Sequence, residues 1–363
     1  MNETLTNRQI AFIVIGALVG DEFIILSHEL AQGAGTGGWF TIVLSSIIVA
    51  ISAYIFAYLG NTHKNQTLYD YSRMLVGKYI TYIFAFIYIF YFLIFSSISS
   101  RLFCEDIKIF ILPRTPISAL YLLLLFAIFL VVDRKLRVLA RLCEFYMSIV
   151  IIGIVIVLTI VITQGEFVNL RPFWNSEDFL SYIKASHYMI APFLGFELLG
   201  CIAFNKDNKG SWKYAILAVF VVSALYIYTF ETCVSVLGVD DVIHYKLVFL
   251  NTLRSVDVPY LDFLKRLDGI AMIFWFMSMF CYLSLFVYGT VFYIKKALSK
   301  IPYRIILLSV LGLSAVVFSI PKSYEEAYGI LNAISYLIIF TALIIPCTLL
   351  ILTKVKKNEK NTR

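Results

Sequence analysis

The feature that most constrains the fold is a series of long apolar runs separated by short polar connections. Runs of about 17 to 25 apolar residues have the length of a membrane-spanning helix. In lipid every backbone polar group has to find its hydrogen bond inside the chain, so such runs form helices. The pattern predicts an all-α integral membrane protein with ten transmembrane helices. The ten runs lie at roughly 9–30, 39–60, 79–102, 117–132, 142–163, 185–204, 213–237, 267–294, 304–320 and 328–352.

The amino-acid composition supports a membrane protein and excludes a soluble one. Hydrophobic residues make up 61% of the chain and charged residues only 15%, far from the proportions of soluble domains. The polar start MNETLTNRQ leads directly into the first run, without the basic start and cleavage site of a secretory signal peptide. We therefore expect the first run to be retained and the lipid bilayer to surround the chain.

The basic residues are distributed unevenly among the connections. If the N-terminus is cytoplasmic, about two thirds of the Lys and Arg residues fall in cytoplasmic segments. Cytoplasmic connections of membrane proteins carry such an excess, so both termini are predicted to be cytoplasmic, with 354–363 as a basic tail. The same distribution accounts for the net charge of +7 without a nucleic-acid partner.

The ten runs divide into two equal halves of a single transmembrane domain, 1–163 and 164–353. Five spans in each half would give the halves opposite topology in the membrane, which is the condition for an inverted repeat. In transporters with such repeats the first helix of each half is discontinuous, and the two breaks form a binding site near the middle of the bilayer. The first and sixth runs are therefore the expected location of a site.

The sixth run, HYMIAPFLGFELLGCIAF at 187–204, contains three residues that a plain membrane anchor lacks. Pro192 removes a helical hydrogen bond and Gly195 loosens the backbone, so the helix is predicted to break there. Glu197 is a carboxylate at membrane depth, where ionisable groups are costly and mark functional sites by default. The alternative is a protonated Glu197 that serves as a fixed, hydrogen-bonded strut between helices.

The first run has a matching interruption at the corresponding position of the first half. Gly16 and Gly20 are followed by two acidic residues, Asp21 and Glu22. A single glycine in a membrane helix usually serves close packing. Two breaks at corresponding positions, each with acidic residues beside it, predict a ligand site between them. Asp21 and Glu22 point in different directions on a helix, so one of the two is expected to line the site.

Several short motifs occur across nearly the whole chain. They are Gly38-Trp39 opening the second run, Arg114-Thr115-Pro116-Ile117 before the fourth, Asn169-Leu170-Arg171-Pro172 after the fifth, Phe193-Leu194-Gly195-Phe196-Glu197 in the sixth, and Val287-Tyr288-Gly289 in the eighth. With these motifs the chain resembles the B subunits of bacterial spore germinant receptors. These are the endospore germination permeases, within the amino acid-polyamine-organocation superfamily.

This resemblance implies a LeuT-like 5+5 inverted repeat with broken first and sixth helices. It also implies a subunit that senses a small germinant, commonly an amino acid, beside partner A and C subunits in the spore inner membrane or cell membrane. Relatives tend to carry Gly-Ala-Gly in the first break, where this chain has Gly20-Asp21-Glu22. Carboxylates at that place repel a ligand carboxylate and favour an ammonium group or a bound cation.

Two further runs contribute candidate lining residues through the resemblance. Tyr91 and Phe95 share one face of the third run, which faces the first and sixth helices in LeuT-like folds. Ser284 and Tyr288, four residues apart in the eighth run, share a face that is expected to point toward the same cavity. For Tyr91 and Phe95 the alternative is ordinary helix packing, and for Ser284 and Tyr288 it is hydrogen bonding to helix carbonyls. The predicted ligand-binding set is Gly16, Gly20, Asp21, Glu22, Tyr91, Phe95, Leu194, Gly195, Phe196, Glu197, Ser284 and Tyr288.

The sequence contains no nucleophile elbow, phosphate-binding loop, zinc signature or dinucleotide fingerprint. Its six cysteines are scattered singly, without paired spacing. We therefore expect neither an enzyme nor a bound cofactor or metal. Three functions stay open: a receptor subunit that senses a germinant, a proton- or sodium-coupled transporter of an amino acid or amine, and a scaffold that binds no germinant itself.

Overall fold

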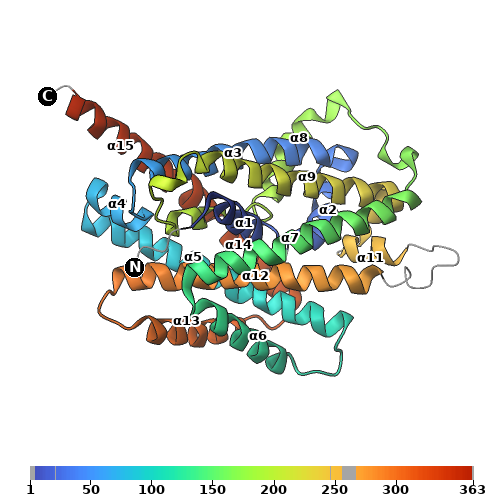
Figure 1. Ribbon diagram of the computed structural model, residues 1–363. Helices are drawn as coiled ribbons and strands as arrows, with labels where there is room; N and C mark the ends of the chain where they lie inside the picture. Colours follow the sequence, from blue (N-terminus) through green and yellow to red (C-terminus); the bar gives the residue numbers. More distant parts are fainter. Residues whose placement is uncertain (1–4, 21, 246, 256–266, 362–363) are drawn as a thin grey trace.

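The computed structural model describes residues 5–20, 22–245, 247–255 and 267–361, and all regular elements of these residues are helices (Figure 1). Six helical stretches are long and apolar enough to cross a membrane, and three shorter apolar helices accompany them. The chain is therefore a multi-pass membrane protein. The six long stretches are Phe23–Thr62, Lys78–Phe110, Lys135–Gln164, Ser211–Leu237, Leu267–Ala297 and Tyr324–Lys356, and the shorter helices are Asn7–Leu18, Ile117–Val132 and Tyr303–Phe318.

The first half of the chain is built from long helices with tight connections. α1 begins at a capping box, in which the Thr6 hydroxyl accepts from the Gln9 amide and the Gln9 side chain accepts from the Thr6 amide. Between α4 and α5, Gly77 has φ of +85°, a conformation that glycine adopts without strain. The helices are α1 (Asn7–Leu18), α2 (Glu22–Ala34), α3 (Gly38–Thr62), α4 (Leu68–Val76), α5 (Lys78–Phe110), α6 (Ile117–Val132) and α7 (Lys135–Val161).

The second half is less regular, and its irregularity lies in the sixth and tenth runs. The sixth run forms two short 3₁₀ turns, η5 (Ser186–Met189) and η6 (Phe196–Cys201), in place of a continuous α-helix. The tenth run contains a π-helical stretch, η9 (Ile339–Ile344). The α-helices are α8 (Phe179–Ala185), α9 (Ser211–Leu237), α10 (Val239–His244), α11 (Val248–Arg254), α12 (Leu267–Ala297), α13 (Tyr303–Phe318), α14 (Tyr324–Ser335) and α15 (Ile345–Asn361).

α1 lies in the middle of the bundle, in contact with α7, α9 and α12. α3 packs along α9, and α12 packs against both α5 and α7 (Figure 1). On the outside, large apolar side chains such as Phe86 and Leu123 are two-thirds exposed, at 66% and 69%. Soluble proteins rarely expose large apolar patches, whereas lipid tails cover them in a bilayer. The short α1 and the interrupted sixth run are thus surrounded by helices rather than by lipid.

Candidate ligand site between two helix breaks

The first break separates α1 from α2. α1 ends at Leu18, α2 begins at Glu22, and Val19 and Gly20 lead out of α1 without continuing it. The break lies where the glycine and acidic residues predict it. Asp21 lies outside the described residues, and the Glu22 side chain is also outside them, so the choice between these two carboxylates stays a prediction.

The second break lies between η5 and η6 and depends on Gly195. This glycine has φ of +112°, and a Cβ atom placed on it would lie 2.4 Å from the Ala17 carbonyl oxygen and 2.8 Å from the Ala17 side chain. Both the backbone conformation and the available space therefore require glycine. The close approach to Ala17, one residue before the end of α1, means that the two breaks touch each other directly.

Glu197 is fully buried beside these breaks. Its Oε2 accepts a hydrogen bond of 3.0 Å from the Gly195 amide, one of the donors that the break frees. Its Oε1 has no hydrogen-bond partner in the described part of the chain. One oxygen thus serves the local backbone, as in the strut alternative, and the other is left for a further contact.

The Tyr91 hydroxyl of α5 lies beside the Glu197 carboxyl group and interacts with it. The two groups do not reach hydrogen-bond geometry, so the hydroxyl is also buried without a partner among the described residues. Buried polar atoms are nearly always hydrogen-bonded in native proteins, and leaving one unpaired costs about 1–3 kcal/mol. Two such atoms close together offer hydrogen-bonding sites for a polar ligand group, a proton or a water molecule.

Two hydroxyl groups from other helices satisfy the carbonyls that the breaks free. The Tyr226 hydroxyl of α9 lies 2.7 Å from the Leu18 carbonyl and 3.0 Å from the Pro192 carbonyl, and so bridges both breaks. The Ser278 hydroxyl of α12 donates to the Val19 carbonyl. Sequence reasoning missed both residues. A single hydroxyl in an apolar helix carries no signal, because its partner is set by the packing of distant segments.

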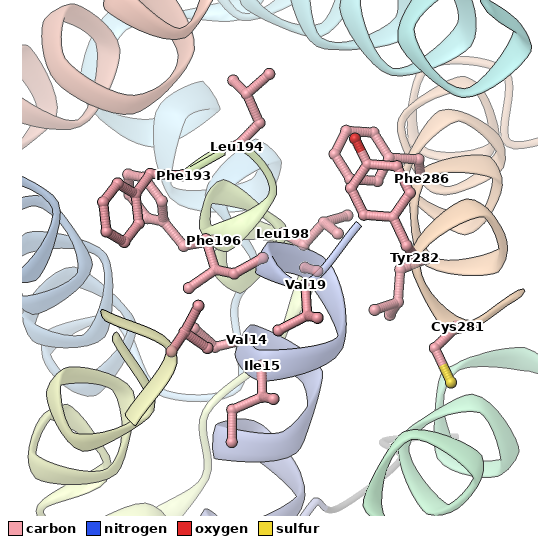
Figure 2. Packing of buried hydrophobic residues seen from close by; sticks show 14 of the residues in the cluster. Val14, Ile15, Val19, Phe193, Leu194, Phe196, Leu198, Cys281, Tyr282 and Phe286 are labelled. Atoms are coloured by element: carbon pink, nitrogen blue, oxygen red, sulfur yellow. The ribbon is translucent and has the colours of Figure 1, made fainter. Parts of the chain in front are cut away.

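An aromatic wall from α5 and α12 closes the other side of the first break. Phe95 and Tyr282 each pack on Phe286, with ring centroids 5.3 Å and 4.6 Å apart. A Cβ atom on Gly20 would lie 2.6 Å from the Tyr282 ring, so this glycine lets the wall approach the break. Figure 2 shows Val19 at the end of α1, with the η6 segment on one side and Tyr282 and Phe286 on the other.

Ser284 and Tyr288 lie on a different face of α12. They follow Tyr282 by two and six positions, so they lie on another side of the helix from the Tyr282 ring. Ser284 is fully buried, and its hydroxyl has no partner among the described residues. The α12 contacts at the first break come instead from Ser278 and Tyr282. A ligand contact by Ser284 or Tyr288 stays a prediction.

The remaining predicted residues are buried near the breaks but differ in what they contact. A Cβ atom on Gly16 would lie 3.3 Å from the Cys143 sulfur of α7, so this glycine serves close helix packing. Leu194 and Phe196 are almost completely buried, and the Phe196 ring meets Phe56 of α3 edge-on. The structure thus brings Gly20, Gly195, Glu197, Tyr91 and Phe95 around the two breaks, and Gly16 faces away from them.

These features define the chain as a helical membrane protein with the fold of a transporter. A mutant of the manganese transporter of Eremococcus coleocola has a similar structure, with a TM-score of 0.62 and 15% identity, over 94% of this chain and 78% of the transporter. By sequence, the chain belongs to the spore germination protein family, whose family model matches residues 4–327. This confirms the family that the sequence motifs predict.

Individual relatives support the same family. Spore germination protein YndE of Bacillus subtilis (strain 168) is 24% identical to this chain over 97% of both proteins. Spore germination protein KB of the same organism is 26% identical over 78% of this chain and 76% of KB. Spore germination protein A2 is also 26% identical, over 78% of both proteins. The similarity to YndE covers nearly all of this chain, including both helix breaks.

Proposed function

We propose that this chain is the membrane subunit of a spore germinant receptor, which binds a small germinant at the two helix breaks and thereby triggers germination. The germinant is an amino acid or an amine. The partners are the receptor's A and C subunits, and the location is the spore inner membrane or cell membrane with both termini cytoplasmic. Family membership and the transporter fold support this proposal.

The observation that carries the proposal is the buried pair of Glu197 Oε1 and the Tyr91 hydroxyl beside the breaks. A germinant ammonium group offers the three donors that a carboxylate and a phenol oxygen accept. Glu197 also accepts the hydrogen bond from the Gly195 amide, and Gly195 packs directly on Ala17. A ligand bound to Glu197 is therefore expected to change the packing between the two breaks. Binding shifts a conformational equilibrium only by the difference in affinity for the two states, and this contact is where such a difference arises.

We also propose that the helices form a LeuT-like 5+5 inverted repeat of ten spans. The break between α1 and α2 opens the first half, 1–163, and the break between η5 and η6 opens the second, 164–353. Each break frees backbone groups in the middle of a protein-lined region, as the discontinuous helices of such repeats do. The basic residues of 354–363 then form the cytoplasmic tail.

The test uses spores that rely on this receptor alone. Glu197→Gln keeps an oxygen acceptor for the Gly195 amide and removes the charge, and Gly195→Leu fills the contact with Ala17. Both variants are expected to abolish germination without lowering the amount of protein in the spore membrane. Glu177→Gln, at an exposed position, and Gly312→Leu, which has open space around it, are the matched controls. Normal germination of both site variants would overturn the proposal.

A proton- or sodium-coupled transporter of an amino acid or amine is the second candidate. The likeness to a transporter structure favours it, since the same fold permits net movement of a ligand across the membrane. Protein reconstituted in liposomes under an imposed proton or sodium gradient separates the two functions. Accumulation of labelled amino acid would support transport, and saturable binding without net flux would support sensing. A scaffold that binds no germinant would give neither signal.

A further inference from the structure

A cavity of about 280 Å³ lies where α2, η5 and α14 meet. A smaller cavity of about 70 Å³ adjoins it, because Glu29, Tyr188 and Tyr328 line both. We call the two together the mouth cavity. It extends as far as Ala191, one residue before Pro192, and no described residue of the predicted ligand-binding set lines it. The mouth cavity thus reaches the second helix break at Ala191 but is lined by none of the described residues predicted to bind the ligand.

The wall of the mouth cavity combines aromatic rings with carboxylates. Tyr188, Tyr324 and Tyr328 supply rings, and Glu29 and Glu325 supply carboxylates from α2 and α14. None of the described residues that line the cavity is Lys or Arg. Aromatic rings attract a cation over their faces, and carboxylates add the opposite charge. This wall therefore suits a cation with an apolar body and is unfavourable for an anion.

The two histidines of the wall do not reverse this preference. His28 turns its Nδ1 to the Val242 carbonyl at 3.3 Å, and His187 turns its Nδ1 to the Lys184 carbonyl at 2.6 Å. A ring nitrogen that faces a carbonyl acts as a donor, so the Nδ1 atom of each ring is already used by the backbone.

An organic cation fits this wall better than a metal ion. No group of three or more His, Cys, Asp or Glu side chains in the described ranges is placed to hold a metal. Glu29 already accepts a hydrogen bond from the Tyr328 hydroxyl, which holds a ring and a carboxylate side by side. The volume is near the lower end of the range for small-molecule pockets, about 300 to 1,000 Å³, so the ligand is small.

We propose that the mouth cavity is a second ligand site, which binds a small organic cation bearing an ammonium group against the rings of Tyr188, Tyr324 and Tyr328, with Glu29 as the counter-charge. Because Ala191 lines the cavity and belongs to the sixth-run break, a cation held there lies next to that break. The site does not depend on the proposed function, since it requires no ligand at Glu197.

The test is a ligand-observed NMR titration of the purified full-length protein in lipid nanodiscs at constant ionic strength. The probes are choline, ethanolamine and 3,3-dimethyl-1-butanol, which has the shape of choline without its charge. At least one of the two cations is expected to bind saturably. The neutral alcohol is expected to bind about three- to thirtyfold more weakly than choline, the range that cation–π attraction provides.

Variants separate the mouth cavity from other places where a cation could bind. Glu29→Gln and Tyr324→Leu are expected to weaken cation binding about three- to thirtyfold. Glu326→Gln, whose carboxylate accepts from the Lys322 amide and does not line the cavity, is expected to leave it unchanged. Glu197→Gln is expected to leave choline binding unchanged, because the quaternary ammonium of choline has no N–H donor for that carboxylate. Retention of the wild-type gel-filtration profile shows that a variant is folded.

Four results would overturn the proposal. They are the absence of saturable binding by both cations, equal affinity for the neutral alcohol, unchanged affinity in folded Glu29→Gln and Tyr324→Leu, and loss of choline binding in Glu197→Gln. The last result would place the cation at the helix breaks instead. Loss of germination in Glu197→Gln spores with intact choline binding would support both sites independently.

Discussion

Replacement of Gly195 by alanine tests the contact between the two helix breaks. The added Cβ atom would lie 2.4 Å from the Ala17 carbonyl oxygen, which belongs to the backbone and cannot rotate away. A left-handed backbone costs an L-residue roughly 1–2 kcal/mol, and overpacking costs about 1–3 kcal/mol more. We therefore expect the Gly195→Ala protein to lose roughly 2 to 5 kcal/mol of folding free energy.

Two other glycines divide this loss into its two causes. Gly210 has φ of +79° with open space around its Cβ position, so Gly210→Ala carries the backbone strain without the clash. Gly312 lies in α13 with open space and an ordinary helical backbone. Gly312→Ala is expected to leave stability unchanged or to raise it by up to about 1 kcal/mol, because alanine has the higher helix propensity.

Thermal unfolding in detergent, followed with a thiol-reactive fluorescent dye, measures all three variants. Five of the six cysteines are buried, so the dye reacts mainly as the protein unfolds. For a chain of this length we expect Gly195→Ala to lower the unfolding temperature by roughly 3 to 8 °C and Gly210→Ala by about 1 to 2 °C. If Gly195→Ala unfolds within about 1 °C of Gly210→Ala, a shift that corresponds to no added clash energy, the two breaks do not touch and the reasoning fails.

Three further predictions concern the hydroxyl groups and a charged pair of the bundle. Tyr226→Phe leaves the Leu18 and Pro192 carbonyls without their shared donor, and is expected to lower the folding free energy by about 1–3 kcal/mol. The same unfolding assay measures this loss. Tyr228→Phe is the control, because the Tyr228 hydroxyl is on the exposed side. Ser278→Ala is expected to lower the folding free energy by a similar amount, about 1–3 kcal/mol, because the Val19 carbonyl loses its donor. Ser278→Thr keeps the hydroxyl, and so separates this loss from the effect of a changed side-chain shape. Burial raises the pKa of Asp70, but hydrogen bonds from Lys296 and Thr67 outweigh it and leave the pKa below its usual value. The stabilisation by this pair, up to about 1 kcal/mol for a partly exposed pair, is therefore complete above about pH 4 and lost as the pH falls through the lowered pKa. The unfolding temperatures of wild type and Asp70→Asn should differ by a constant amount from pH 8 to about pH 5 and converge in stronger acid. If the two unfolding temperatures already converge between about pH 7 and 6, the lowered pKa of Asp70 is not the cause.

The sequence by itself determined the membrane character of the chain and the positions of its helix breaks. Run length and hydropathy are local properties, so the fourth run at 117–132 reappears as α6 with the same bounds. Glycine and proline act on the backbone where they stand, so Gly20 and Gly195 indicate the two interruptions without knowledge of their neighbours. The short motifs likewise indicated the family, which the family model confirms.

Only the tertiary structure decided which side chains meet at the breaks. Tyr226 and Leu18 are 208 positions apart, so nothing near either residue reveals that one phenol bridges both breaks. Gly16 and Gly20 look alike in sequence, but one packs on Cys143 and the other on Tyr282, because a helix turns its positions toward different neighbours. The mouth cavity has the same origin, since its rings and carboxylates come from α2, η5 and α14 and become a site only where those segments pack together.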